Sequence, residues 1–354
     1  MGGTDVREPG RAFIGSFTSA GGRGILAADV DPATGALTVT GATDVLPDPS
    51  YLALAGPLLY AVSEAEEGAV AAFDVSGGAP RPLGAPVAVR GAGPTHLAVA
   101  AGHVLTANYT SGSVTALPVT ADGSLDAAAV VALHEGSGPV ADRQSAPHAH
   151  HVLPAPGGPW AAAVDLGTDS VRIYALHPVT GAPKPHGETP LRPGTGPRHL
   201  AFHPAGTHAY VVNELEPTLT VCRWDAATGT LEPLGETSVV PEGSAGPDYP
   251  SEVVVAPDGR FLWVAVRGAD TIAVLALDPG GEKAEFRAAV PCGGRWPRDL
   301  ALGPTGRRLY AANERSGDVT WFDVDPESGI PHRAGSVDAP AASCVVFSGN
   351  GRHG

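Results

Sequence analysis

Residues 196–206 read GPRHLAFHPAG, and residues 209–214 read AYVVNE. Together they predict a turn, a short apolar strand, a tight Pro-x-Gly turn and a second apolar strand that ends in polar residues. Weaker copies of this unit follow one another at about 45 to 55 residues, the interval expected for propeller blades. The apolar residue that opens the unit recurs seven times, at Leu52, Leu97, Val152, Leu200, Val253, Leu300 and Val345.

The repeat predicts an all-β fold, a seven-bladed β-propeller with four-stranded antiparallel blades, because one unit cannot bury its apolar face alone. Residues 12–18, AFIGSFT, match a second strand, whereas residues 343–347, SCVVF, match a first strand. We therefore expect N- and C-terminal strands to close the last blade, which removes exposed sheet edges. The single propeller domain would span residues 12–348, with flexible tails at 1–11 and 349–354.

Composition and charge narrow the possible partners. The net charge of −15 over 354 residues argues against nucleic acid and anionic membranes. Cys222, Cys292 and Cys344 have no metal-type spacing, which is typical of reduced thiols in a cytosolic protein. Neither a signal core nor an apolar run of transmembrane length is present. We expect a cytoplasmic protein that is a monomer or a weak homo-oligomer.

Strand direction predicts a polar site at one mouth of the central channel. In each antiparallel blade, the start of the first strand and the end of the second lie at the same end, and the first strands surround the channel. The strand starts carry Ser50-Tyr51, Thr95-His96, His150-His151, Arg198-His199, Ser251-Glu252, Arg298-Asp299 and Ser343-Cys344. The strand ends carry Thr18, Glu64, Tyr109, Asp165, Glu214, Arg267 and Glu314. Two convergent polar rings favour a small-molecule site.

Basic side chains gather at this mouth although the chain is acidic. Five arginines map to it: Arg143, Arg198, Arg267, Arg295 and Arg298. Guanidinium groups bind carboxylate and phosphate in a bidentate manner, so a small anionic substrate is expected. Some of these arginines could instead pair with Asp299, Glu252 or Glu314 in structural networks.

Histidines supply the candidate acid-base group. His148, His150 and His151 form a cluster, and neutral imidazole is a good general base near pH 7. His150 or His148, beside Arg198 and Glu214, could activate water. The spacing carries no partner Cys or Asp pattern, so no metal and no cofactor are expected. Because the chain lacks a Gly-rich phosphate loop, a Gly-x-Ser-x-Gly elbow and a Cys–His pair, covalent catalysis is not expected.

Several motifs also carry a family resemblance. They are RQSAPHAH at 143–150, DLGTD at 165–169, GPRHLAFHP at 196–204, VNEL at 212–215, SEV at 251–253 and VRG at 266–268. On these motifs the chain resembles the lactonase family of seven-bladed β-propellers, over roughly residues 13–347. That family includes propeller-type 6-phosphogluconolactonases and fungal carboxy-muconate lactonising enzymes.

The resemblance implies a set of site residues. In the muconate-lactonising relatives a His, an Arg, a Glu and a second Arg have been proposed as the active constellation, and by motif these resemble His150, Arg198, Glu214 and Arg267. All four belong to the two rings predicted from strand direction. The chain departs from the family at Ala265-Val266, where a polar Ser-Asn often precedes the Arg. The surrounding candidates for substrate binding are His148, His199, Arg143, Arg298 and His96.

Three functions remain open at this point. The first is hydrolysis of a small anionic sugar lactone, by default 6-phosphogluconolactone, a step of carbohydrate metabolism. Arg198 and Arg267 would hold the anionic group or the developing oxyanion, and His150 would act as general base with Glu214 orienting it or the water. The second is cyclisation of a carboxy-cis,cis-muconate by the same groups. The third is a non-catalytic binding platform, which predicts a large exposed apolar patch outside the channel.

Overall fold

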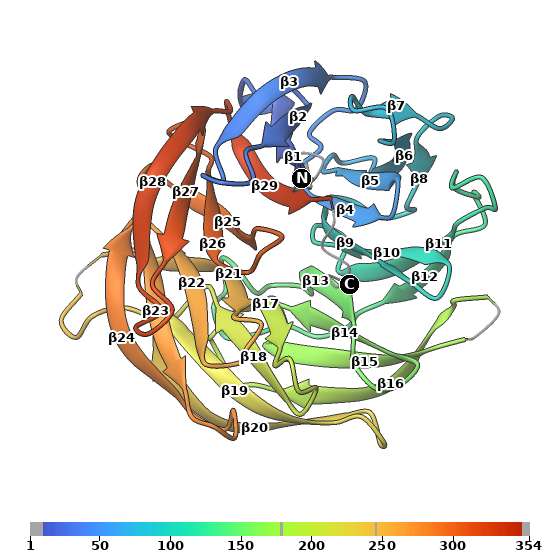
Figure 1. Cartoon of the computed structure of the whole chain (residues 1–354). Helices are drawn as coiled ribbons and strands as arrows, with labels where there is room; N and C mark the ends of the chain where they lie inside the picture. The colour runs from blue at the N-terminus through green and yellow to red at the C-terminus, as the bar shows by residue number, and fades with distance from the viewer. Residues whose placement is uncertain (1–9, 178–179, 245, 349–354) are drawn as a thin grey trace, which may run out of the picture.

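The computed structural model describes residues 10–177, 180–244 and 246–348. In these residues the strands form seven antiparallel sheets that stand around a central axis like the blades of a propeller (Figure 1). Six sheets have four strands, and the seventh has a short extra strand. The predicted all-β, seven-bladed fold is therefore confirmed. The expected tails at residues 1–9 and 349–354 lie outside the described residues.

The blades are numbered here from the N-terminus. Blade 1 contains β1 (Gly10–Ser16), β2 (Ile25–Val30), β3 (Leu37–Thr43) and β29 (Ala342–Phe347), with a 3-10 turn at Thr18–Ala20. Blade 2 contains β4 (Leu52–Ala55), β5 (Leu58–Ser63), β6 (Ala69–Asp74), β7 (Arg81–Pro82) and β8 (Val87–Ala88). Blade 3 contains β9 (Pro94–Ala100), β10 (His103–Asn108), β11 (Ser113–Pro118) and β12 (Val130–Leu133).

The remaining blades are regular four-stranded meanders. Blade 4 contains β13 (Ala149–Pro154), β14 (Trp160–Asp165), β15 (Ser170–Leu176) and β16 (Pro183–Pro190). Blade 5 contains β17 (Pro197–Phe202), β18 (His208–Asn213), β19 (Thr218–Asp225) and β20 (Thr230–Ser238). Blade 6 contains β21 (Tyr249–Val255), β22 (Phe261–Arg267), β23 (Thr271–Leu277) and β24 (Ala284–Pro291). Blade 7 contains β25 (Pro297–Leu302), β26 (Arg308–Asn313), β27 (Asp318–Val324) and β28 (Pro331–Asp338).

Blade 1 is closed by both ends of the chain, as the sequence predicted. The C-terminal β29 pairs antiparallel with β1, with Val345 opposite Ile14 and Phe347 opposite Ala12. Figure 1 shows the red β29 beside the blue β1 near the axis. β1 begins at Gly10, two residues before the expected domain start, and Arg11 already pairs with Asp29 of β2. This closure joins the first and last blades, so the ring has no free ends.

Apolar side chains fill every interface between neighbouring blades. The buried residues form seven clusters, and each cluster joins residues of two adjacent blades. The middle strands are therefore covered on both faces and read as continuous apolar runs, such as Leu262–Val266 in β22, rather than alternating ones. Each large side chain so buried contributes about 1.5–3 kcal/mol. Among the described residues, no helix has the length and hydropathy needed to cross a bilayer.

Candidate functional site

An irregularity at the same point of the innermost strands directs polar side chains into the channel. The register with the second strand shifts by one residue at His150 in β13, at Arg198 in β17 and at Arg298 in β25. A β-bulge of this kind re-aims side chains. As a result, His150 and His151 are consecutive in the chain, yet both rings contact His199 of the next blade, with centroids 5.2 and 4.3 Å away.

The four predicted catalytic residues lie together at one mouth of the channel, and Glu214 is at their centre. Its Oε2 lies 3.2 Å from Nε of Arg198 and accepts a hydrogen bond of 2.8 Å from Arg267. Its Oε1 accepts one of 2.5 Å from Arg143, which comes from the loop between β12 and β13. Three arginines from three different segments therefore share one carboxylate.

Burial strengthens the ion pairs between Glu214 and the arginines, because little solvent screens them. The exposed fractions of Arg198, Glu214 and Arg267 are 3%, 5% and 6%. Burial by itself disfavours the ionised carboxylate, but the charges of Arg267 and Arg198 outweigh it and hold the pKa of Glu214 below its ordinary value. Glu214 is therefore ionised at neutral pH and acts as the counter-ion of the arginines.

The two arginines are also anchored to the backbone of blade 6. Arg198 donates from a terminal nitrogen to the carbonyl of Ser251. Arg267 donates from Nε to the carbonyl of Tyr249 at 3.1 Å and from a terminal nitrogen to that of Pro250 at 3.3 Å. These carbonyls hold Arg267 in place although the apolar residues Ala265 and Val266 precede it.

His150 lies beside this cluster but is not hydrogen-bonded to Glu214. Both oxygens of Glu214 face guanidinium groups, and Nδ1 of His150 has no hydrogen-bond partner among the described residues. The ring of His150 meets the rings of Tyr109 and His199 edge to face, at 5.5 and 5.2 Å. Burial, followed by the charge of Arg198, lowers the pKa of His150 well below its ordinary value, so the imidazole is neutral. In the described residues Glu214 therefore holds the arginines rather than His150, and its orientation of the water stays a prediction.

The predicted substrate-binding residues separate into two layers. Arg143, His148 and Arg298 are partly exposed and form an outer layer at the mouth. The His148 ring stacks on Tyr109 at 4.4 Å and donates from Nδ1 to the Tyr109 carbonyl. Arg298 lies 3.4 Å from Glu314 and 3.8 Å from Glu64. His96 and His199 are buried beneath this layer, with centroids 5.4 Å apart.

Asp165 does not belong to the mouth, which corrects one member of the predicted ring. Its carboxylate accepts backbone hydrogen bonds from His148 and Gly167 and contacts Nδ1 of His134 at 2.5 Å. His134 in turn contacts the hydroxyl of Tyr174 at 2.7 Å. In the strand pairing of blade 4, Asp165 occupies the position that Asn213 has in blade 5, one residue before Glu214. The residue of blade 4 that corresponds to Glu214 is therefore Leu166, which is buried. The sequence reasoning was one residue off at this strand end.

Trp296 is a mouth residue that the sequence reasoning missed. Its backbone has a φ of 63°, which is strained for a bulky side chain, and its N–H donates to Asp270 at 2.7 Å. The guanidinium carbon of Arg315 lies 3.3 Å from the centre of its ring, and that of Arg267 lies 5.5 Å away. The indole ring therefore stabilises the guanidinium group of Arg267 by a cation–π contact. An aromatic residue in the otherwise polar run GGRWPR at 293–298 was the available signal.

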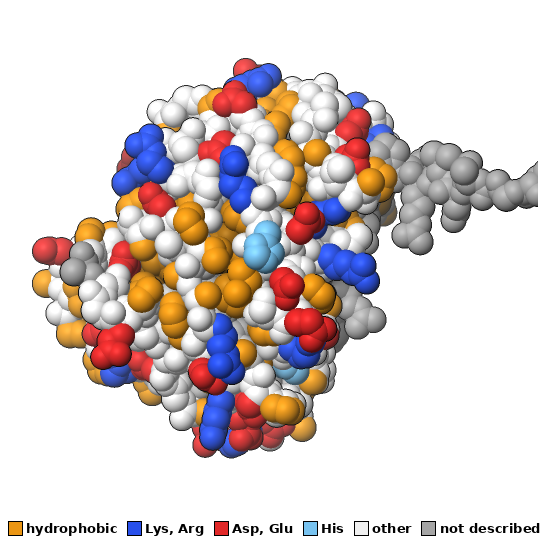
Figure 2. Space-filling view, turned by 60° about the vertical axis from the view of Figure 1, so that its left-hand side comes forward, with side chains coloured by type: hydrophobic (Ala, Val, Ile, Leu, Met, Phe, Trp, Pro, Cys, Tyr) orange, Lys and Arg blue, Asp and Glu red, His pale blue; other side chains and the backbone are white. Residues whose placement is uncertain are grey.

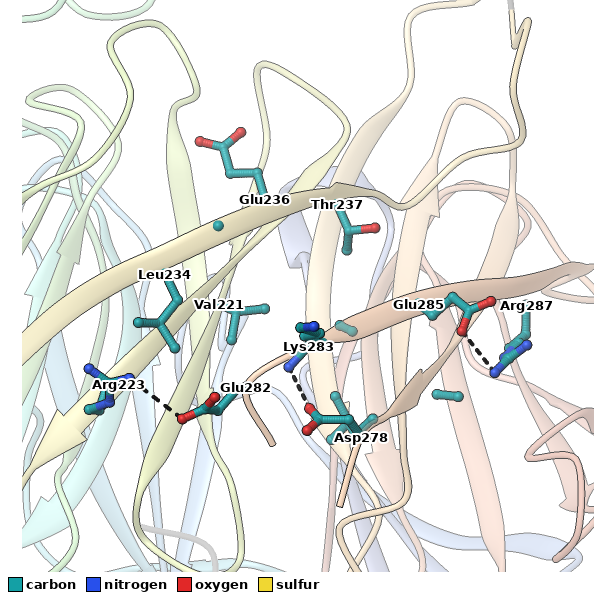
Figure 3. Close-up of a pocket in the computed structure, with 14 residues that line it drawn as sticks. Val221, Arg223, Leu234, Glu236, Thr237, Asp278, Glu282, Lys283, Glu285 and Arg287 are labelled. Atoms are coloured by element: carbon teal, nitrogen blue, oxygen red, sulfur yellow. Dashed lines mark hydrogen bonds and ion pairs between the residues drawn. The ribbon is translucent and has the colours of Figure 1, made fainter. Parts of the chain in front are cut away.

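Two other kinds of candidate site in the described residues would be a metal cluster and a groove on the outer wall. Within the residues that the structure describes, no group of three or more His, Cys, Asp or Glu side chains is placed to hold a metal ion. A groove of about 740 Å³ lies on the outer wall, between the outer strands of blades 5 and 6 (Figure 3). Both arginines that line it are paired with carboxylates, Arg223 with Glu282 and Arg287 with Glu285.

Comparisons with known proteins agree with this architecture. A 6-phosphogluconolactonase of Bacillus subtilis is 34% identical over 95% of this chain and 97% of its own length. The solved structure of a periplasmic gluconolactonase from Pseudomonas aeruginosa is 30% identical, with a TM-score of 0.87 over 96% of this chain and 98% of that one. The structure of a putative 6-phosphogluconolactonase from Bacteroides fragilis is 27% identical, with a TM-score of 0.89 over 98% of this chain and 99% of that one.

The family assignment rests on the chain as a whole. A family model described as "Lactonase, 7-bladed beta-propeller" matches residues 11–347. The match begins in β1 and ends at the last residue of β29, so it includes every blade. The chain therefore belongs to the lactonase family of seven-bladed β-propellers.

Proposed function

We propose that this protein is a lactonase that hydrolyses a small anionic sugar lactone at the channel mouth, with 6-phosphogluconolactone as the first substrate to test. The observation that carries the proposal is the meeting of Arg143, Arg198 and Arg267 around one carboxylate, beside the neutral imidazole of His150. Full-length relatives named 6-phosphogluconolactonase and gluconolactonase favour this reaction class.

Lactone hydrolysis needs an activated water and a stabilised oxyanion. In this proposal neutral His150 accepts the proton of the attacking water. Arg198 and Arg267 donate to the oxygen on which negative charge develops, in a buried setting where such donors are most effective. The negative charge of Glu214 offsets the repulsion between the two guanidinium groups, and its contacts hold both groups in position before the substrate binds.

The outer layer would bind the charged tail of the substrate. Arg143 is 36% exposed and lies on a loop, so it is accessible to an incoming anion. Arg298 is held at 3.4 Å and 3.8 Å by its two glutamates, which are longer contacts than those around Glu214. Its guanidinium therefore keeps donors for a carboxylate or phosphate. His148 completes this layer.

The test is a hydrolysis assay on purified protein. We expect δ-gluconolactone 6-phosphate to open faster with protein than in buffer, with acid release followed at constant pH. Arg198→Ala should abolish most of this acceleration, whereas Arg223→Ala, on the outer wall, should retain it. An Arg198→Ala protein with unchanged turnover would show that the assigned role is wrong.

Two other readings are tested in parallel. A carboxy-cis,cis-muconate would lose its absorbance on addition of protein if the same groups catalysed cyclisation instead. A binding platform would need a large exposed apolar patch, but few large apolar side chains in the described residues are exposed. They come from a loop of blade 1, from β12 and from β20: Val45, Val130, Leu133 and Leu234. Figure 2 shows one side of the molecule, where charged side chains of both signs interrupt the apolar surface. The expected cytoplasmic location stays a prediction, since one solved relative is named as periplasmic.

A further inference from the structure

Beneath the mouth, each blade contributes one titratable side chain to a closed inner ring. The members are Tyr51, His96, His151, His199, Glu252, Asp299 and Cys344. Six of them are buried, and Tyr51 is partly buried. Around the ring, neighbouring aromatic centroids are 4.1, 3.9 and 4.3 Å apart from Tyr51 to His199. Asp299 and Tyr51 each interact electrostatically with Cys344, which closes the circle.

One arc of this inner ring is hydrogen-bonded. Nδ1 of His199 and Oε2 of Glu252 share a hydrogen bond of 2.7 Å, and the carboxyl of Glu252 in turn interacts with that of Asp299. Backbone N–H groups fix both acids, from Val253 to Glu252 at 3.0 Å and from Val345 to Asp299 at 2.8 Å. The arc is therefore held rigidly by blades 5, 6, 7 and 1.

Both acids are harder to ionise than free carboxylic acids. Burial and then the charge of Asp299 raise the pKa of Glu252 well above its ordinary value. Burial raises the pKa of Asp299 to about 6. When this pair carries one proton, His199 donates its Nδ1–H to Glu252, and its Nε2 carries a free lone pair. That Nε2 is buried and has no hydrogen-bond partner in the described residues.

The ring of His199 lies beside that of the proposed general base. The rings of His150 and His199 meet edge to face with centroids 5.2 Å apart, and Nδ1 of His150 is also buried without a hydrogen-bond partner among the described residues. Because the two nitrogens do not hydrogen-bond to each other, a proton passes between them through one bridging water. His96 and His151 are equally buried, but neither has a carboxylate partner among the described contacts.

We propose that His199 and Glu252 form a proton relay behind His150. The proposal rests on the lactonase function: a bond forms between water oxygen and the carbonyl carbon, and the water proton passes to His150. Through one bridging water, His150 passes a proton to Nε2 of His199, while the Nδ1 proton of His199 moves to the Glu252–Asp299 pair. When the ring C–O bond breaks, the relay runs backwards and the leaving oxygen receives the proton. One water is consumed for each lactone, and no other reactant is needed.

His199 and Glu252 act through His150 and do not touch the substrate, so they are positioning residues. Their effect should appear in kcat and not in KM. Glu252→Gln keeps the size and the hydrogen bond but removes the proton acceptor, and we expect kcat to fall about 10²-fold, in the lower range for proton transfer by a positioned group. Glu252→Asp should recover part of the loss. His199→Gln should match Glu252→Gln.

The pH profile separates a relay from a packing role. The ionisable groups that face the arc are His150, His151, His96, Tyr51, Arg198 and Cys344. We expect wild-type kcat to fall as pH drops through about 6, because protonation of Asp299 leaves the pair unable to accept a proton. Glu252→Gln should change the pH at which kcat falls, whereas a substitution that only disturbs packing should leave that pH unchanged.

His151→Gln is the matched control, because it removes a neighbouring buried imidazole of the same inner ring that lacks a carboxylate. Melting temperatures of all variants are measured beside the kinetics. The relay is supported if His151→Gln leaves kcat and its pH profile unchanged, while a folded Glu252→Gln protein has a lower kcat and a shifted pH profile. It is overturned if Glu252→Gln changes neither quantity, or if His151→Gln lowers kcat as much as Glu252→Gln does. A wild-type protein without lactonase activity would instead refute the proposed function itself.

Discussion

Replacing Glu214 by Gln should strongly destabilise the fold as well as remove activity. The carboxylate is the shared counter-ion of Arg143, Arg198 and Arg267, and two of these are buried with it. Glutamine has nearly the same shape but no charge, and its amide N–H₂ would face guanidinium donors. Two positive charges would then remain buried without compensation.

The magnitude follows from the burial of each pair. Removing one partner of a buried ion pair costs about 3–5 kcal/mol, because the other charge is left desolvated. The side chains of Arg198 and Arg267 are 3% and 7% exposed, so this range applies to them as a group. The side chain of Arg143 is 36% exposed, and solvent screening limits its share to about 1 kcal/mol or less. We expect a loss of about 3–5 kcal/mol in the free energy of unfolding.

Denaturant titration provides the assay, with Glu232→Gln as the matched control. Glu232 pairs with Arg223 at 2.8 Å, but both side chains are exposed, so its loss should cost about 1 kcal/mol or less. Because the folded-state pKa of Glu214 lies below the ordinary value of 4.5, its stabilisation is complete above that pH and disappears in acid. The stability difference between wild type and Glu214→Gln should therefore shrink as pH falls below 4.5. Equal losses in the two variants at neutral pH would refute this reasoning.

Four further outcomes are expected. Arg198→Ala should lower kcat about 10²–10³-fold in the lactone assay, the usual cost of one oxyanion donor; a change confined to KM would contradict that role. Arg143→Ala should mainly raise KM, since this arginine lies in the exposed outer layer; a loss confined to kcat would argue against it. Tyr174→Phe should cost about 1–3 kcal/mol in denaturant titration, because buried His134 loses its partner, while activity stays unchanged. Asp299→Asn should abolish the fall of kcat near pH 6, and a fall that persists would assign that limb to another group.

The blade repeat was predictable because its causes are local. Tight turns such as Asp31–Gly35, where the carboxylate of Asp31 accepts from two backbone N–H groups and Gly35 has a φ of 72°, are written in consecutive residues. The apolar runs between such turns have the length of strands. The match of residues 343–347 to a first strand was enough to predict the closure of blade 1.

The composition of the mouth was predictable, but the contacts within it were not. Alternation along a regular strand would place His150 and His151 on opposite faces, whereas the bulge brings both toward His199. Asp165 lies outside the mouth because it pairs in the register of Asn213, one residue before Glu214, and the exact end of a strand depends on pairing with its neighbours. Trp296 was missed because its role comes from a strained backbone and from Arg315, which follows it by a whole hairpin.

The sequence by itself determined the number of blades, the way the ring closes and the kinds of side chain at each end of the channel, since turn residues and apolar periodicity act over a few neighbours. The tertiary structure decided which charges meet. Glu214 is shared by three arginines, two of which, Arg143 and Arg267, are 71 and 53 residues away in the chain. Glu252 likewise joins His199 of blade 5 to Asp299 of blade 7. Such pairings depend on distances set by packing around the axis, and these distances are not encoded in any local stretch.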